Sequence, residues 1–239
     1  MRRYLSVVAL VGLLALVGAA NGYTGGKFRW GGLLAVKGKA ADGADAKSGQ
    51  NGSKGSGTSN AEAYHSYVLG SMYELKNDFY GAIREFQKAI KLDPDSSFLH
   101  LSLASLYTRV GRMNEAVEEA EEAVRLENGN IEAIMLLGNL YASLNKGERA
   151  KEEYYKVLEI DPQNEQAYLS LGSLYADEGK MEKAVEVLEK LSSVSPHSFM
   201  GLYTLGRLYA QKGDLDRAEE FLRRSIEQNP GFDRAMAFL

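Results

Sequence analysis

Apolar and small residues recur along this chain at a fixed spacing of 34 residues. In one copy, a first helix is predicted by the i, i+3, i+4, i+7 spacing of Tyr168, Leu171, Gly172 and Tyr175. A second helix is predicted by the apolar face formed by Ala184, Leu188 and Leu191. Each copy therefore predicts a helical hairpin, and the regular repeat predicts a stacked array of such hairpins.

The repeat occurs five times in the same register. Its aromatic position holds Tyr73, Tyr107, Tyr141, Tyr175 and Tyr209, and nine residues later the second helix carries Ala82, Ala116, Ala150, Ala184 and Ala218. Between the helices lie residue types that readily adopt left-handed backbone: Asn77, Gly111, Asn145, Gly179 and Gly213. We expect the chain to reverse there. The predicted repeats are residues 63–96, 97–130, 131–164, 165–198 and 199–232, with the start of a sixth hairpin at 233–239.

The small residues let the two helices of a hairpin approach closely. Replacing Gly172 or Ala184 with Leu should overpack the pair and cost about 1 to 3 kcal/mol. A single hairpin buries too little apolar surface to offset the entropy of ordering its backbone, so neighbours must stack. The side chains expected to pack between neighbouring hairpins are Met72, Leu106, Leu140, Leu174 and Leu208.

This pattern resembles the tetratricopeptide repeat (TPR) family. The match in the fourth copy rests on Tyr168, Leu171-Gly172, Tyr175, Ala184, Leu188 and Pro196, and in the first on Leu69-Gly70, Tyr73, Ala82, Phe86, Ala89 and Pro94. The departures are Ala104, Asn128-Gly129, Val157, Leu191 and Ser225. The resemblance covers residues 63–232. It implies an all-α fold, an α-solenoid in the form of a right-handed superhelix, with the first helices lining a concave groove.

The first 60 residues have a different character. Residues 1–20 combine Arg2-Arg3 with an apolar stretch and the small residues Gly18-Ala19-Ala20, which is typical of a secretory signal peptide. An uncleaved N-terminal membrane anchor is the alternative. Residues 21–60 have the composition of a flexible Gly/Ser/Lys-rich linker, containing one apolar patch at 28–36. That patch is either part of the linker or a segment that contacts a membrane or a partner.

Charge follows the same division. The chain has a net charge of -4; its first 60 residues contain eight Lys or Arg and two Asp, which leaves -10 for residues 61–239. An acidic array argues against nucleic acid as a partner, because such binding depends on clustered Lys and Arg. The basic N-terminal part is compatible with anionic lipid head groups.

No catalytic constellation is found. The chain has no Cys and three histidines, His65, His100 and His197, none in a recognisable catalytic context. His65 and His100 lie on adjacent first helices, but no further residue completes a metal site. We therefore predict no enzymatic activity, no cofactor and no metal.

The resemblance places one apolar stripe and one more polar edge on the concave surface. The stripe is Tyr67, Leu101, Met135, Leu169 and Tyr203, and the edge is Ser71, Ser105, Asn139, Ser173 and Arg207. One interpretation is a groove that binds a partner peptide or helix. The other is that the stripe, which lies at the rim of the apolar arc, seals contacts between repeats.

Two functions remain from the sequence. The first is a non-catalytic scaffold or adaptor of the bacterial cell envelope, exported to the periplasm or anchored in the inner membrane, that binds protein partners. The second is a targeting or regulatory arm of a larger enzyme, such as a glycosyltransferase or peptidase, of which residues 1–239 are a fragment. The apolar residues of 233–239 suggest a stacking face for a continuing chain, a partner or a second copy.

Overall fold

The computed structural model describes residues 56–238. The predicted signal peptide or anchor at 1–20 and the apolar patch at 28–36 lie outside the described residues, as does most of the predicted linker. Within residues 56–238 every regular element is a helix and no strand occurs. The helices are α2 (Ser56–Leu75), α3 (Phe79–Leu92), α4 (Ser97–Arg109), α5 (Met113–Leu126), α6 (Ile131–Ser143), α7 (Gly147–Ile160), α8 (Glu165–Asp177), α9 (Met181–Val194), α10 (Phe199–Lys212), α11 (Leu215–Gln228) and α12 (Asp233–Met236).

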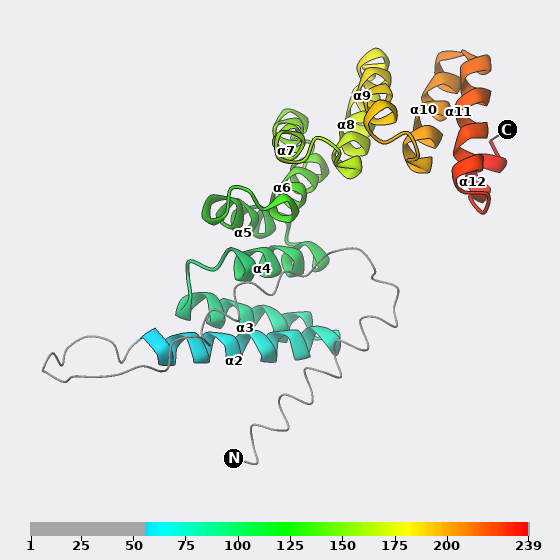
Figure 1. Ribbon diagram of the computed structural model, residues 1–239. Coiled ribbons are helices and arrows are strands. Elements are labelled where there is room, and N and C mark those ends of the chain that lie inside the picture. Colours follow the sequence, from blue (N-terminus) through cyan, green and yellow to red (C-terminus); the bar gives the residue numbers. More distant parts are fainter. Residues whose placement is uncertain (1–55, 239) are drawn as a thin grey trace, which may run out of the picture. The chain divides into compact units, whose positions relative to one another are not determined.

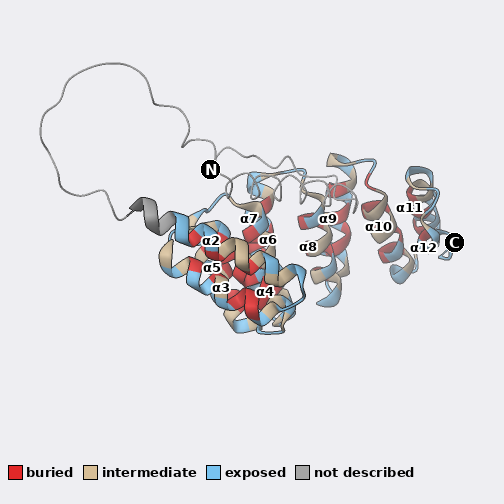
Figure 2. Ribbon diagram, turned by 90° about the horizontal axis from the view of Figure 1, so that it is seen from below, coloured by how far each residue is buried: buried red, intermediate tan, exposed pale blue. Residues whose placement is uncertain are grey.

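The helices pack as consecutive hairpins (Figure 1). Helix α2 packs on α3, α4 on α5, α6 on α7, α8 on α9 and α10 on α11, and each second helix then packs on the first helix of the next hairpin. Buried residues lie along the faces where these helices meet, and exposed residues lie on the outer faces (Figure 2). The predicted all-α solenoid of stacked hairpins is confirmed.

Helix α2 begins earlier than the composition suggests. Residues 56–60 were expected to belong to the linker, but they form the N-terminal turn of α2. Once a helix is nucleated, each further residue adds a hydrogen bond for the ordering of one residue, so extension is cheap even for weak helix formers. Composition alone cannot show where this extension stops.

The predicted turns are confirmed by the backbone. All five turn residues have positive φ: 78° at Gly111, 73° at Gly179, 82° at Gly213, 59° at Asn77 and 58° at Asn145. The helix starts are also stabilised locally. For example, Asn130 and Asn164 each accept a hydrogen bond from the backbone N–H three residues later, at 3.1 and 3.0 Å.

The close approach within each hairpin depends on a matched pair of residues. A Cβ atom added at Gly138 would lie 2.7 Å from the Tyr154 ring, and one at Gly172 would lie 2.9 Å from Leu188. The second hairpin has Ala104 in place of this Gly and Ala120 in place of the large partner, and both alanines are fully buried. The departure at Ala104 is therefore compensated across the helix pair.

Of the other departures on the second helices, Val157 and Leu191 are compensated between hairpins and Ser225 within its own hairpin. Leu191 packs against Gly201, where an added Cβ would lie 2.7 Å from the leucine side chain. Val157 clusters with Ala167 on the next first helix. Ser225 donates a hydrogen bond to the backbone carbonyl of Phe199 at 2.7 Å, which satisfies its buried hydroxyl.

The side chains expected to pack between hairpins do so with one exception. Leu106, Leu140 and Leu208 are buried and Leu174 is half-buried, near Gly147 of the preceding hairpin. Met72, in contrast, is 40% exposed. The expectation for Met72 was wrong because this position packs on the preceding hairpin, and no described hairpin precedes α2.

Candidate functional site

The predicted apolar stripe is largely used for packing. Leu101 is 7% exposed and clusters with Ala123 and Ala133 between two hairpins. The other four members, Tyr67, Met135, Leu169 and Tyr203, are half-buried, and the first three pack against the main core. The stripe therefore seals contacts between helices over much of its area, as the second interpretation of the sequence expects.

The two aromatic members of the stripe are held by other rings. The Tyr67 ring stacks on Phe86 with centroids 5.5 Å apart, and the Tyr203 ring meets Phe232 edge-on at 5.0 Å. Aromatic pairs at such separations add to the stabilisation from burial. Only part of each ring is left for a partner.

The predicted polar edge is more accessible, although most of its members have bonds within the chain. Ser71 and Ser105 donate to backbone carbonyls four residues earlier, each at 3.0 Å. The Asn139 side-chain oxygen accepts a hydrogen bond from the Tyr154 hydroxyl at 2.8 Å. The guanidinium of Arg207 lies over the Tyr203 ring, 5.7 Å from its centroid.

Ser173 and Arg207 are brought together by the fold. Both line a hollow of about 160 Å³ between α8 and α10, closed at one end by the start of α9. Asp177, Thr204 and Gln211 also line this hollow. It therefore offers hydroxyl, amide and charged groups of both signs to a ligand.

Sequence reasoning missed two exposed aromatic residues on the first helices. Tyr64 is 48% exposed on α2 and Phe98 is 49% exposed on α4, at equivalent positions of successive repeats. The Phe98 ring meets Tyr67 edge-on at 5.1 Å, and Tyr64 lies three residues before Tyr67, on the same helix face. We call Tyr64, Tyr67 and Phe98 the aromatic patch. The sequence signal that could have revealed this patch is a large aromatic residue three positions before the stripe residue in the first two repeats.

The structure also explains the recurring tyrosine. In four copies its hydroxyl meets a side chain located 20 residues earlier, on the second helix of the preceding hairpin. The pairs are Tyr107 with Gln87 at 2.8 Å, Tyr141 with Glu121, Tyr175 with Tyr155 at 3.1 Å and Tyr209 with Glu189 at 2.5 Å. Burial and the hydrogen bond to Glu121 raise the pKa of Tyr141 to about 12. The Tyr141 hydroxyl therefore joins neighbouring hairpins as a neutral group at physiological pH.

A buried lysine links the third and fourth hairpins. The Lys151 ammonium on α7 lies 2.6 Å from a Glu148 oxygen and 3.0 Å from a Glu178 oxygen, and it is also 5.2 Å from the centroid of the Tyr175 ring. Burial lowers the pKa of Lys151, but the hydrogen bonds to the two carboxylates outweigh this effect and raise it. Lys151 is therefore charged, and its ion pair with Glu178 links the third and fourth hairpins.

The histidines do not meet in a metal site. His65 is exposed, His100 is buried, and His197 is exposed and bonded to Gln228 at 2.9 Å. Among residues 56–238 no group of three or more His, Asp or Glu side chains is arranged to hold a metal ion. In the same part of the chain, none of the helices has the length and apolar character needed to cross a bilayer.

The fold and the repeated contacts define an α-solenoid built from helical hairpins. Tetratricopeptide repeat models match residues 66–96, 99–130 and 175–238, and a TPR repeat model matches residues 138–179. The chain belongs to the tetratricopeptide repeat family. No curated protein matches the chain.

Solved structures support the same assignment. A crystal structure of MamA is 26% identical, with a TM-score of 0.64 over 72% of this chain and 94% of that one. A second MamA structure is 28% identical, with a TM-score of 0.62 over 70% and 97%. YrrB, described as a TPR protein with an unusual peptide-binding site, is 22% identical, with a TM-score of 0.59 over 75% and 93%. At that identity, YrrB supports the fold alone.

Proposed function

We propose that this protein is a non-catalytic scaffold that binds a peptide or helix of a protein partner along its first helices. The observation that carries the proposal is the aromatic patch, in which Tyr64 and Phe98 leave about half of their surface to solvent. Aromatic side chains are the commonest anchors of protein interfaces, because they bury a large area with few rotatable bonds. The patch shares Tyr67 with the predicted groove, and its two outer rings are accessible to a partner.

The polar hollow lined by Ser173 and Arg207, between α8 and α10, is a second accessible region on the first helices. A partner with apolar side chains toward α2 and α4, and polar groups toward α8 and α10, matches both regions. A solved TPR structure, that of YrrB, has a peptide-binding site. We therefore choose a peptide as the class of ligand to test.

The test is selection of peptides from a display library on the immobilised full-length protein. Phe98→Ala and Tyr64→Ala should each weaken binding of the selected peptides by about tenfold or more, as expected when an interface anchor is truncated. Tyr80→Ala is the matched control, because Tyr80 is a 65% exposed aromatic on the second helix α3. Equal binding by all three variants would reject the patch as the binding surface.

We propose further that the protein works in the cell envelope, exported through residues 1–20. The supporting observation is the charged start and apolar stretch of that segment, followed by small residues. Mass spectrometry of the protein from its native host tests this. A mature N-terminus close to Ala20 supports cleavage and export, an intact Met1 in the membrane fraction supports an anchor, and an intact Met1 in the cytoplasmic fraction contradicts export.

A further inference from the structure

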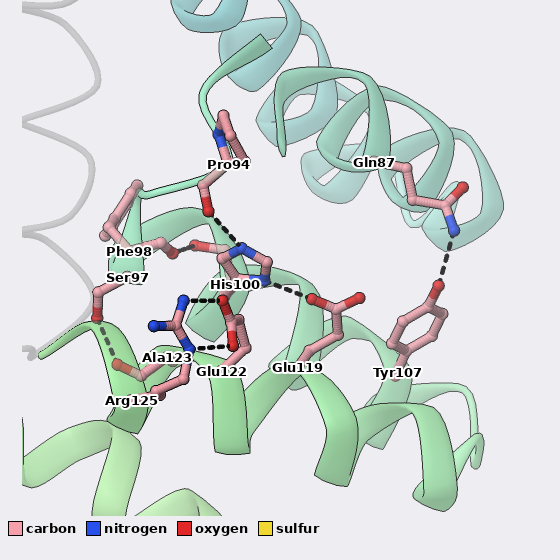
Figure 3. A network of polar contacts seen from close by, with 11 residues as sticks. Gln87, Pro94, Ser97, Phe98, His100, Tyr107, Glu119, Glu122, Ala123 and Arg125 are labelled. Atoms are coloured by element: carbon pink, nitrogen blue, oxygen red, sulfur yellow. Dashed lines mark hydrogen bonds and ion pairs between the residues drawn. The ribbon is translucent and has the colours of Figure 1, made fainter. Parts of the chain in front are cut away.

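The imidazole of His100 lies between two elements that it joins (Figure 3). His100 is on α4 and is 7% exposed. Its Nδ1 atom is 2.6 Å from a Glu119 carboxylate oxygen on α5, and its Nε2 atom is 3.1 Å from the Pro94 carbonyl oxygen in the turn between α3 and α4. One side chain thus connects the end of the first hairpin to both helices of the second.

Both partners of this imidazole are hydrogen-bond acceptors. A carbonyl oxygen cannot donate, and an ionised carboxylate cannot donate either. A neutral imidazole has a single N–H, whereas an imidazolium has two. Both contacts are therefore hydrogen bonds only when the His100–Glu119 pair carries one extra proton, which gives the ring its second N–H.

We infer that His100 is a proton-dependent latch, which ties the α3–α4 turn to α5 when protonated and releases one of the two contacts when it loses its proton. Release leaves either the Glu119 carboxylate or the Pro94 carbonyl facing a ring lone pair. An acceptor oxygen that faces a ring lone pair has lost its hydrogen bond, so the junction between the first and second hairpins should open more often. This inference does not depend on the proposed function.

The surrounding charges favour the protonated form. The hydrogen bond from the ring to the Glu119 carboxylate raises the pKa of His100 most, burial lowers it, and the Pro94 carbonyl and the charges of Glu119 and Glu122 raise it again. The net pKa lies above its ordinary value of 6.5. Glu122 is itself paired with Arg125 on α5, at 2.6 Å.

The other neighbouring elements add little charge at this point. From α3, the side chain in the same network is the neutral Gln87, which is bonded to Tyr107 (Figure 3). In the turn, Asp95 acts on Arg125 of α5. The carboxylates of α5 are thus the charges that set the titration of His100.

The direction of the pH effect follows from linkage. Because the folded pKa is raised above the unfolded value, the stabilisation is fully present below the unfolded pKa, near 6.5. It is lost as the pH rises through the folded pKa. The latch therefore closes as the pH falls below the folded pKa and opens as the pH rises above it.

Equivalent positions in the other hairpins hold no titrating pair of this kind. The residues at these two positions are Ser66 with Glu85, Ile134 with Glu153, Tyr168 with Val187, and Leu202 with Phe221. In the fourth hairpin the Tyr168 hydroxyl donates to the Pro162 carbonyl at 3.3 Å, which replaces the turn contact of His100 with a bond from a neutral group. The double variant His100→Tyr/Glu119→Val therefore gives the second hairpin the side chains of the fourth.

The first experiment is a histidine NMR titration of the full-length protein, which has three histidines. Long-range ¹H–¹⁵N spectra report the protonation of both ring nitrogens, and the signals missing from His100→Tyr/Glu119→Val assign His100. We expect His100 to titrate above pH 6.5, with hydrogen on both ring nitrogens below its titration. Glu119→Gln should lower the pH at which the ring titrates. A His100 titration at or below pH 6.5, or an unchanged titration in Glu119→Gln, would overturn the latch.

The second experiment is hydrogen exchange of residues 97–126, corrected for the intrinsic effect of pH on exchange, at one pH below and one above the titration of His100. Wild type should lose protection at the higher pH, by about tenfold for each pKa unit between the folded and unfolded states. His100→Tyr/Glu119→Val should show no such loss. An equal loss in both proteins would mean that His100 does not control opening. If the double variant fails to fold, His65→Gln and His197→Gln at the two exposed histidines assign His100 by elimination, and the NMR titration of wild type and Glu119→Gln keeps the inference testable.

Discussion

The second and fourth hairpins have the same backbone architecture but opposite choices at two pairs of positions. Where the second hairpin has Ala104 facing Ala120, the fourth has Gly172 under Leu188. Where the second has a hydrogen-bonded His100 and Glu119, the fourth has Tyr168 and Val187. The comparison teaches that the fold constrains each pair jointly rather than each residue singly. Such jointly filled sites are expected of a core packed at high density.

The largest loss of stability should come from truncating the large residue of such a pair. Leu188→Ala removes a fully buried side chain that fills the space above Gly172, and it should lower the free energy of unfolding by about 2 to 5 kcal/mol. Denaturant titration followed by circular dichroism measures this. The exposed Leu215→Ala on α11, where the side chain is 68% exposed, is the control and should change stability little.

A transplant between the two hairpins gives the next effect. Ala120→Leu puts the large residue of the fourth hairpin against Ala104 and should cost about 1 to 3 kcal/mol by overpacking. Adding Ala104→Gly recreates the pair found in the fourth hairpin and should restore most of the lost stability. If the double variant is no more stable than Ala120→Leu, joint constraint within the pair is refuted.

The tyrosine contacts between hairpins give a graded effect, which at Tyr141 is similar to that of the transplant and at Tyr107 is smaller. Tyr141→Phe removes a hydrogen bond to the carboxylate of Glu121, and charged hydrogen bonds contribute about 1.5 to 3 kcal/mol. Tyr107→Phe removes a bond to the neutral Gln87, for which about 0.5 to 1.5 kcal/mol is expected. Thermal melts of the two variants should therefore rank Tyr141→Phe as the less stable. The reverse order would show that charge at this contact does not contribute.

The smallest effect, and one of opposite sign, is expected in the first hairpin. Ser66 occupies the position of His100, is fully buried, and its hydroxyl has no hydrogen-bond partner among the described residues. Ser66→Ala removes that unpaired group and improves helix propensity, so it should stabilise the protein by up to about 1 kcal/mol. Differential scanning calorimetry against wild type measures the change. A lower melting temperature would show that the Ser66 hydroxyl is satisfied in solution.

Much of the fold is readable from the sequence, because it depends on local signals. The spacing of Tyr168, Leu171 and Gly172 defines one helix face, and residues such as Gly111 and Asn145 mark where the chain must take positive φ. What the sequence pattern does not reveal depends on partners that are distant in the chain. The contact of His100 with Glu119 joins two helices, and so does each tyrosine bond to the preceding hairpin.

The candidate site was harder to predict than the fold. Periodicity places Leu101 and Phe98 on the same helix, but the depth of burial at the rim of the apolar arc is decided by the neighbouring hairpin. Leu101 is covered by Ala123 and Ala133, whereas Phe98, three residues earlier, stays half exposed. Two residues about one helical turn apart on the same helix therefore differ in role: Leu101 is structural and Phe98 is a candidate anchor.

The contact of Leu191 with Gly201 implies that residue sizes at the boundary between repeats restrict which repeat can follow which. If the unit 165–198 were followed by a copy of 97–130, Leu191 would meet Leu99 where Gly201 now lies, and two bulky side chains would compete for one space. Swapping, deleting or duplicating units by recombination is therefore restricted to boundaries where the small and large residues still match. The array is modular in its backbone, but its modules are not interchangeable.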